Sequence, residues 1–192
     1  MKKTESGREQ FKKFKFLLSF MIKCYSLFPL KIRKKIFEKK RFLRGKFGIA
    51  VRYALLKSIA KKVGDNVAIH QGCYILNAEN LVIGDNVSIH PMCYIEALGG
   101  VEIGNDVSIA HATTILSTSH TYKDVEIPIK YQKVDLLPTK IGDNVWLGAK
   151  STILGGISIE SGCVVGAGAV VTHNVKTNSI VAGVPAKIIK ER

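Results

Sequence analysis

His120 is the side chain in this sequence best suited to acid–base chemistry. It stands directly before residues 121–140, a 20-residue stretch that interrupts an otherwise regular pattern. The pKa of an imidazole lies near neutral pH, so the ring can take a proton from a hydroxyl group and give it back. A long interruption inside a repeat usually serves binding. By residue type and position alone, a general base and a solvated loop histidine are equally good interpretations of His120.

Nucleophilic and metal-based chemistry have less support. No Cys or Ser is placed beside a base in a way that predicts an acyl-enzyme. The four Cys have unrelated spacings and no CxxC pair, which argues against a zinc ribbon or a secreted disulfide scaffold. We therefore expect no metal and a reducing, cytoplasmic setting. No apolar run is long enough to span a membrane, and no cleavable signal peptide is expected.

A repeat of six residues must position these groups. Three blocks of 20 residues, starting at Val63, Ile83 and Ile103, align without a gap, and each has an aliphatic residue at every sixth place. The period returns after the interruption, from Ile141 to Val171. In all, fifteen six-residue windows have Val, Ile or Leu in first place. Agreement on this scale indicates a solenoid built from one repeated unit.

The period has a simple physical interpretation. Three short extended sides, each with one inward aliphatic residue, form one coil of a parallel β-solenoid whose corners favour Gly, Asn and Asp. The fifth place of each window also points inward and should be small. Ten of the windows fit this expectation, with Val67, Cys73, Val87, Cys93, Val107, Thr113, Val145, Ser151, Cys163 and Ala169 at that place. Three of the four Cys are therefore expected to be small buried side chains.

Three motifs give the solenoid a family resemblance. They are ILSTSH (residues 115–120), IGDNVWLG (141–148) and VGAGAVVTH (165–173), the last followed by AGVPAKIIK (182–190). Residues 63–192 resemble the left-handed parallel β-helix of the hexapeptide-repeat acyltransferases, and within it the maltose and galactoside O-acetyltransferase branch with its capsule and exopolysaccharide relatives. The resemblance implies a left-handed β-helix, an acetyl-CoA donor, and a homotrimer whose active sites are each shared by two chains.

The resemblance also assigns roles to residues near the acceptor. His120 matches the general base that takes the proton of an acceptor hydroxyl as it attacks the thioester. His90 matches an Asn that helps to hold the acceptor, with an outward corner residue stacked on His70 as the alternative. Asp124 could orient the imidazole or simply solvate the loop. His111 is a weaker candidate.

The acyl donor would lie along the C-terminal coils. Trp146, Gly148 and Ala149 would flank the pantetheine arm, and Gly166, Ala167, Thr172 and His173 would line the groove further on. Lys187 and Lys190 would pair with the CoA phosphates. The family more often has Arg at these two places and Lys at the place of His173, so phosphate binding is expected to be weaker or differently arranged. A solvated tail is the alternative for the two Lys.

The first 62 residues differ in character from the rest. They hold 20 Lys and Arg against 3 Asp and Glu, whereas residues 63–192 hold 9 against 12, and all eight Phe lie between Phe11 and Phe47. This divides the chain into a basic helical segment, residues 1–62, and a β-helix, residues 63–192. One helix face is expected to carry Phe11, Phe14, Leu18, Met21, Ile22, Tyr25 and Phe28.

Such a basic, Phe-rich helix is typical of peripheral contact with an anionic membrane, through residues 11–46, at the inner membrane face. Pro29 should end it. A second helix with Val51, Leu55 and Ile59 should cap the first coil. A purely structural cap is the main alternative for the whole segment. Nucleic acid is not expected as a partner, because no recognisable nucleic-acid module is present.

These observations predict an O-acetyltransferase that acts on a sugar hydroxyl of a surface polysaccharide or its precursor, by direct transfer. A small soluble acceptor, such as a free sugar or an antibiotic, is the second enzymatic interpretation. A non-catalytic β-helix scaffold is the third. The zinc-dependent gamma-class carbonic anhydrases share the fold but need two His five residues apart, and the sequence has no such pair.

Overall fold

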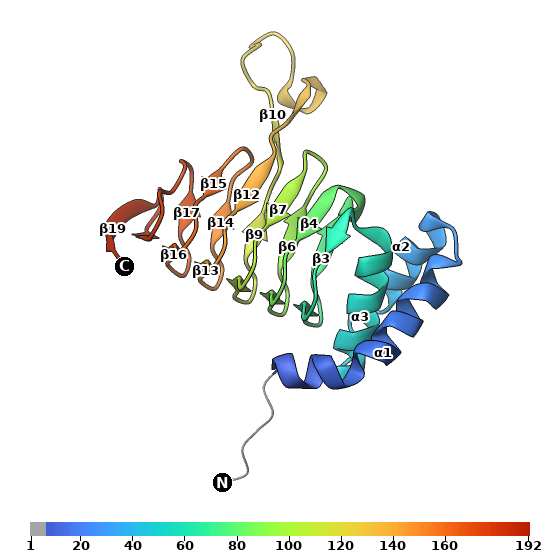
Figure 1. Cartoon of the computed structure of the whole chain (residues 1–192). Coiled ribbons are helices and arrows are strands. Elements are labelled where there is room, and N and C mark those ends of the chain that lie inside the picture. Colours follow the sequence, from blue (N-terminus) through green and yellow to red (C-terminus); the bar gives the residue numbers. More distant parts are fainter. Residues whose placement is uncertain (1–6) are drawn as a thin grey trace.

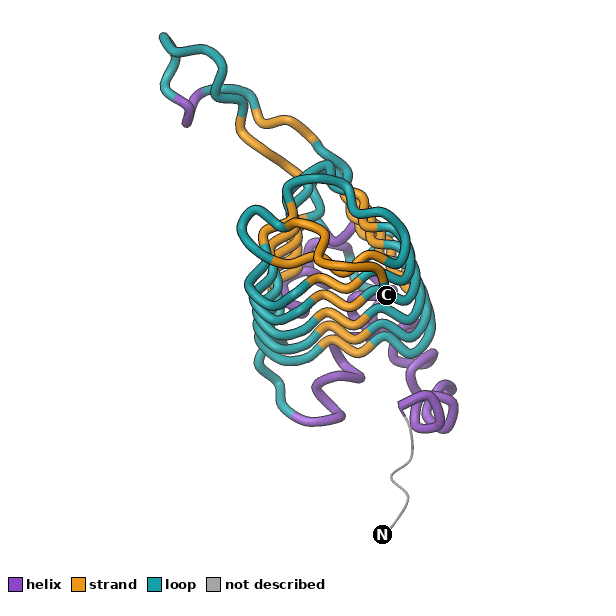
Figure 2. Tube along the Cα trace, turned by 90° about the vertical axis from the view of Figure 1, so that its left-hand side faces the viewer, coloured by secondary structure: helices purple, strands orange, loops and turns teal. Residues whose placement is uncertain are grey.

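The computed structural model describes residues 7–192, and most of them form a left-handed parallel β-helix. Five complete coils and the start of a sixth stack along one axis, with three helices at the N-terminal end (Figure 1). Seen along the axis, successive coils superimpose and one long loop leaves the body at a corner (Figure 2). The solenoid predicted from the six-residue period is confirmed.

Three sheets make the sides of the prism. Sheet A contains β1 (Lys62–Val63), β4 (Leu81–Ile83), β7 (Val101–Ile103), β12 (Thr139–Ile141) and β15 (Ser158–Ile159). Sheet B contains β2 (Ala68–Ile69), β5 (Ser88–Ile89), β8 (Ser108–Ile109), β13 (Trp146–Leu147), β16 (Val164–Val165), β18 (Ser179–Ala182) and β19 (Lys187–Glu191). Sheet C contains β3 (Tyr74–Leu76), β6 (Tyr94–Glu96), β9 (Thr114–Ile115), β14 (Thr152–Ile153) and β17 (Val170–Val171). Neighbouring strands are parallel, except that β19 turns back antiparallel on β18. The corners are named here by the two sheets that they join.

The register of the strands follows the sequence repeat. Ile69 pairs with Ile89 and Ile89 with Ile109, so residues at equal places in the windows stack directly on one another. All fifteen first-place aliphatic residues are buried, and so are the ten fifth-place residues named above, the three Cys among them. One continuous column of apolar side chains therefore fills the prism, as predicted.

Two different constraints select the corner residues. Positive φ values occur at the fourth place, as at Asn66, Asn86 and Asn144, where an amide side chain tolerates the left-handed region. The second-place glycines meet another need. A Cβ on Gly84 would lie 2.8 Å from the Gly104 backbone of the next coil, so only a hydrogen fits. At the fourth place Asn, Asp or Gly thus serves the backbone angle, and at the second place Gly serves the close approach between coils.

A β-ribbon leaves the prism at the C–A corner of the third coil. It is formed by β10 (Thr118–His120) and β11 (Val134–Leu136), which pair antiparallel, and the short 3₁₀ helix η2 (Ile129–Tyr131) lies near its tip. The ribbon starts three residues earlier than the predicted excursion at 121–140, because Thr118 already pairs with Leu136. His120 is therefore on the ribbon itself and not at the corner.

Three helices cover the N-terminal end of the solenoid. They are α1 (Gly7–Ser26), α2 (Leu30–Lys39) and α3 (Gly45–Ile59), and a second 3₁₀ helix, η1 (Ala78–Asn80), closes the first coil. As predicted, α1 ends before Pro29, and Val51, Leu55 and Ile59 of α3 are buried over the first coil. Arg52 was not anticipated. It is fully buried, and its guanidinium donates to the carbonyl oxygens of Ile69 (2.9 Å) and Leu43 (2.6 Å), fixing α3 to the coil below.

The face predicted to contact a membrane is largely packed inside the molecule, and of its residues Phe14 and Phe28 are exposed. Leu18 is buried, and Phe11 packs edge-to-face on Tyr53 of α3 at 5.5 Å between ring centroids. Met21, Ile22 and Tyr25 also pack against the core. The predicted face is thus a helix–helix interface, because α1 has a second apolar face that the 3.6-residue pattern did not separate from the first. Within residues 7–192, no helix is both long and apolar enough to cross a bilayer.

Candidate active site

His120 stands on the ribbon with its side chain exposed. In the antiparallel pair it lies opposite Val134, and the next amide, of Thr121, donates to the carbonyl of Lys133 at 2.9 Å. These bonds hold the backbone on both sides of the histidine. Its ring makes no hydrogen bond to any of residues 7–192. The imidazole is thus carried on an ordered strand and is open to an incoming hydroxyl group.

Glu96 braces the foot of the ribbon and was missed by the sequence analysis. It lies one coil below, at the C–A corner, and its Oε2 accepts hydrogen bonds from the Thr118 hydroxyl (3.0 Å) and the Ser117 amide (3.2 Å). Its Oε1 accepts from the amide of Leu98. The carboxylate therefore ties the start of β10 to the coil beneath. The available signal was a charged residue in a column that otherwise holds Leu76, Leu116, Leu154 and Thr172.

Asp124 has a local role in the loop. Its Oδ1 accepts from the amide of Glu126 at 3.0 Å, and its carbonyl accepts from the side chain of Gln132 at 2.7 Å. No hydrogen bond joins the carboxylate of Asp124 to His120. In this structure Asp124 shapes the loop turn and does not contact the imidazole of His120 through a hydrogen bond.

His90 lies at a different corner from His120. It is at the B–C corner, stacked on His70 with ring centroids 5.0 Å apart and planes 10° from parallel. Burial lowers the pKa of His70, and the nearby charges of His90 and Arg52 act in the same direction. His111 lies at the same corner one coil further on. These three histidines do not approach His120 within one chain, because the whole width of sheet C lies between the two corners.

The residues expected around the acyl donor fall mainly on sheet B and the B–C corner. Trp146 is 54% exposed and lies in one register row with Val164, Ile180 and Lys190. Trp146 and Lys190 are three strand spacings apart, roughly 14 Å at about 4.8 Å per spacing. We call Trp146, Val164, Ile180 and Lys190 the sheet B row. Gly148 and Gly166 stack at the corner beside this row, and Ala182 above them pairs with Lys187. Ala149 and Ala167 follow these two glycines around the corner.

Two of the expected donor residues lie elsewhere. Thr172 and His173 are at the C–A corner of the fifth coil, and the Thr172 hydroxyl is 2.8 Å from Nδ1 of His173. They share this corner with the ribbon that carries His120. The structure therefore gathers the candidates into two groups, one at each end of sheet C. Within one chain, the width of that sheet keeps the two groups apart.

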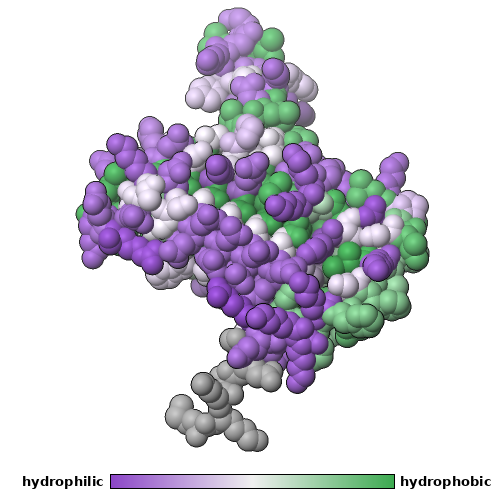
Figure 3. Space-filling model, viewed as in Figure 1, coloured by the Kyte–Doolittle hydropathy of each residue, from purple (hydrophilic) through white to green (hydrophobic). Residues whose placement is uncertain are grey.

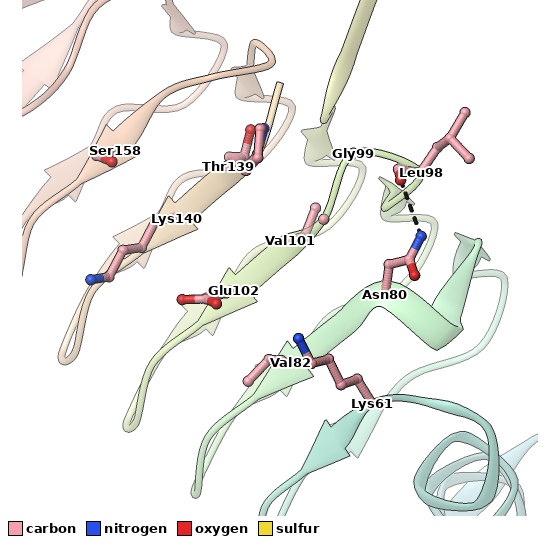
Figure 4. A pocket seen from close by; sticks show the side chains of 12 residues that line it. Lys61, Asn80, Val82, Leu98, Gly99, Val101, Glu102, Thr139, Lys140 and Ser158 are labelled. Atoms are coloured by element: carbon pink, nitrogen blue, oxygen red, sulfur yellow. Dashed lines mark hydrogen bonds between the residues drawn. The ribbon is translucent and has the colours of Figure 1, made fainter. Parts of the chain in front are cut away.

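A groove of about 600 Å³ with a mixed polar and apolar lining crosses sheet A and ends at the foot of the ribbon (Figure 4). Val82, Glu102 and Lys140 lie side by side on neighbouring strands along it. At the ribbon end, the Asn80 side chain donates to the carbonyl of Leu98 at 3.0 Å. Charged, amide and hydroxyl groups of this kind can exchange hydrogen bonds with a ligand rich in hydroxyl groups. Across residues 7–192, no group of His, Cys, Asp and Glu side chains is arranged to hold a metal ion.

The fold and the two corner groups define the class of protein, a hexapeptide-repeat β-helix, and the comparisons with known proteins agree. Residues 138–173 match the family model described as the hexapeptide repeat of succinyl-transferase. The galactoside O-acetyltransferase of Escherichia coli K12 is 31% identical over 145 residues, which cover 73% of this chain and 68% of that protein. The chain belongs to the hexapeptide-repeat acetyltransferase family.

Other relatives match over shorter segments. A protein of E. coli K12 named "Putative lipopolysaccharide biosynthesis O-acetyl transferase WbbJ" is 45% identical over 65 residues, 34% of this chain and 33% of the relative. A Mycobacterium tuberculosis protein, "Probable acetyltransferase Rv3034c", is 40% identical over 78 residues, 41% of this chain. The matched segments thus span only 26% and 33% of the lengths of these two relatives.

Solved structures match over most of the chain. A maltose O-acetyltransferase from Clostridium difficile 630 aligns with a TM-score of 0.74 and 27% identity, covering 84% of each chain. A galactoside acetyltransferase in complex with coenzyme A aligns with a TM-score of 0.75 and 28% identity, covering 84% of this chain and 80% of that one. The similarity extends beyond the repeats, since residues 63–192 alone are about two thirds of the chain.

Proposed function

We propose that this protein transfers an acetyl group from acetyl-CoA directly to a sugar hydroxyl, with His120 as general base. The observation that carries the proposal is an exposed imidazole held on a hydrogen-bonded ribbon in a member of an acetyltransferase family. The imidazole takes the hydroxyl proton as the oxygen attacks the thioester carbonyl. The tetrahedral intermediate then collapses, the C–S bond breaks, and the thiolate of CoA receives the proton from the imidazolium.

The sheet B row, from Trp146 to Lys190, is where we expect the acyl donor to bind. A pantetheine arm is long and narrow, with alkyl segments between two amides, so it can lie against the exposed indole of Trp146 and beside the stacked Gly148 and Gly166, which have no side chains. Ala149 and Ala167, which follow these glycines, have short side chains that leave room for the arm. Lys187 and Lys190 follow on β19 with both ammonium groups exposed, which suits the phosphates of CoA. A related structure that contains coenzyme A supports this choice of ligand.

An active site shared by two chains would explain why the candidate residues lie at two separate corners of one chain. His120, Thr172 and His173 belong to one corner, whereas His90, Trp146 and Gly148 belong to the other. A ring of three chains would bring the first corner of one copy to the second corner of its neighbour and repeat the contact three times. We therefore propose a homotrimer with three such sites. His90 would then reach the acceptor from the chain opposite His120.

The proposed acceptor is a polysaccharide or its precursor. The groove on sheet A spans β4, β7, β12 and β15, about 14 Å at the usual strand spacing, which exceeds the width of one sugar ring. A relative named for lipopolysaccharide biosynthesis supports a polymeric acceptor. A free sugar or an antibiotic would leave most of this groove unused.

The test is release of CoA thiol from acetyl-CoA in the presence of a panel of bacterial glycans. We expect His120→Ala to lower the acceptor-dependent rate by about 10²–10⁴-fold while acetyl-CoA binding is unchanged. Ser119→Ala, on the same strand, is the matched control and should retain activity.

Release that persists in His120→Ala would overturn the general base. CoA binding without release on any glycan, but with release on small soluble acceptors, would replace the polymeric acceptor. Absence of CoA binding would favour a non-catalytic scaffold.

A further inference from the structure

The outer face of α1 is apolar and has no partner within residues 7–192. Phe16 is 88% exposed, Phe20 60% and Leu27 84%. At 100° per residue Phe16 and Phe20 lie on one side of α1, roughly opposite the buried Leu18. Leu27 follows in the turn directly after Ser26, the last residue of the helix. Figure 3 shows hydrophobic residues gathered over the helical end of the molecule. Exposed aromatic residues on this scale are unusual on a soluble surface unless something covers them.

Cations are interleaved with this row. Lys13 and Lys23 lie on the same side of α1 as Phe16 and Phe20, so the order along the chain is Lys13, Phe16, Phe20, Lys23 and, in the turn after α1, Leu27, with all five side chains exposed. We call this set the outer row of α1. An apolar groove of about 380 Å³ runs beside it, between α1 and the start of α3, and is lined in part by Phe14, Leu17 and Phe47. Lys46 stands at the edge of that groove.

The basic residues of the helical segment differ in whether they have acidic partners. Residues 7–62 contain 18 Lys and Arg against 2 Asp and Glu. The ion pairs found there all join the helices to acidic residues near the solenoid: Arg8 to Asp106, Lys15 and Lys57 to Asp65, and Lys34 to Glu79. Lys13 and Lys23 make no ion pair with any of residues 7–192. Arg8, Lys15, Lys34 and Lys57 are thus paired with carboxylates of the solenoid, whereas Lys13 and Lys23 of the outer row are left for an external partner.

We propose that the outer row of α1 docks on an anionic lipid surface, with Phe16, Phe20 and Leu27 entering the acyl boundary and Lys13 and Lys23 at the phosphate headgroups. This is the arrangement of an interfacial amphipathic helix. Residues 63–192 hold 9 basic against 12 acidic residues, so the solenoid is weakly repelled and the helical end is turned to the membrane. The proposal does not depend on the acetyl transfer proposed above.

A second copy of this chain fits the same face poorly. Two helical segments that each carry so many unpaired cations would repel one another across a symmetric contact, whereas lipid phosphates are complementary to them. Apolar contact alone would not require Lys13 and Lys23 in the row. Charge complementarity therefore selects an anionic lipid surface over self-association.

The experiment is flotation of the full chain with vesicles of phosphatidylcholine, with and without phosphatidylglycerol. We expect binding to the anionic vesicles only. The pair Lys13→Glu and Lys23→Glu should weaken it by about 25-fold or more, since each surface Lys contributes roughly fivefold. The pair Phe16→Ser and Phe20→Ser should weaken it on the order of tenfold or more.

The control is the pair Val125→Ser and Tyr131→Ser, which removes equally exposed apolar groups from the ribbon loop and should leave vesicle binding unchanged. Thermal unfolding of each variant checks that the helices remain folded. Equal loss in the control pair, or binding to neutral vesicles alone, would overturn the proposal. So would a change of assembly mass in Phe16→Ser with Phe20→Ser, which would assign the face to a second copy. Binding to duplex DNA in place of vesicles would assign it to nucleic acid.

Discussion

At the scale of single residues, the ribbon that carries His120 depends on Glu96. The carboxylate receives hydrogen bonds from the Thr118 hydroxyl and from the amides of Ser117 and Leu98. An amide in its place would turn two donor hydrogens toward donor groups. If His120 is the general base as proposed, Glu96 is a positioning residue, because it bonds the start of the ribbon strand and not the imidazole.

We expect Glu96→Gln to lower kcat by about ten- to hundredfold, since small displacements of a catalytic group are costly. The KM for acetyl-CoA should stay near its original value, because the sheet B row that is proposed to bind acetyl-CoA does not contact Glu96. Steady-state kinetics and limited proteolysis of the ribbon would measure both effects. Glu126→Gln, in the exposed loop, is the control. A variant with raised KM for acetyl-CoA and unchanged kcat would contradict a positioning role.

His70 should make the protein less stable in mild acid. Its pKa is lowered by burial and by the charges of His90 and Arg52, so the folded ring is neutral where the unfolded ring already holds a proton. The free energy of unfolding is then highest above the unfolded pKa of about 6.5 and decreases as the pH falls below it. Urea unfolding at about pH 7.5 and about pH 5.5 should show a smaller decrease in His70→Phe than in the original chain. An equal decrease would remove His70 as the cause.

At the scale of elements, the two kinds of corner glycine should respond differently to a methyl group. A Cβ added to Gly84 would lie within 2.8 Å of the Gly104 backbone, whereas Gly168 has a φ of +69° and open space around the same position. We expect Gly168→Ala to cost about 1–2 kcal/mol, the usual penalty of the left-handed region. Gly84→Ala should cost more, because two coils must separate. Guanidinium unfolding of both variants would compare them, and equal costs would contradict the role of close approach.

The repeat was predictable to the residue, whereas the ribbon and α1 were not. Fifteen windows with one inward aliphatic residue left a single way to stack the coils. The ribbon boundary depends on pairing between Thr118 and Leu136, which are far apart in sequence and follow no period. On α1, Leu18 and Phe16 are both apolar, and only the packing of α3 decides which of them faces inward. Glu96 escaped notice because its partners lie one coil above it.

At the scale of the whole molecule, a shared site can be tested by mixing two inactive chains. We expect His120→Ala and Trp146→Ala to be weakly active alone and to regain activity when they are unfolded and refolded together. In random trimers about a quarter of the sites would combine an intact His120 with an intact Trp146 from the neighbour. The specific activity of the mixture measures this fraction. The mixture would regain no activity if each chain held a complete site. Sedimentation velocity would independently report the mass of the assembly.

The buried cysteines give the solenoid a reporter at each end. Cys73 and Cys93 lie inside the first two coils and Cys163 inside the fifth, all at equivalent places. A hydrogen bond with Cys73 and burial raise the pKa of Cys93, and burial raises the pKa of Cys163, so neither thiol is reactive while its coil is closed. In a stack of repeats each coil contacts only its neighbours, so one end can open before the other. The order in which these thiols are labelled in dilute denaturant would therefore show which end of the solenoid unfolds first. Early labelling of Cys73 and Cys93 would indicate the end under the helices, and early labelling of Cys163 the end at β19.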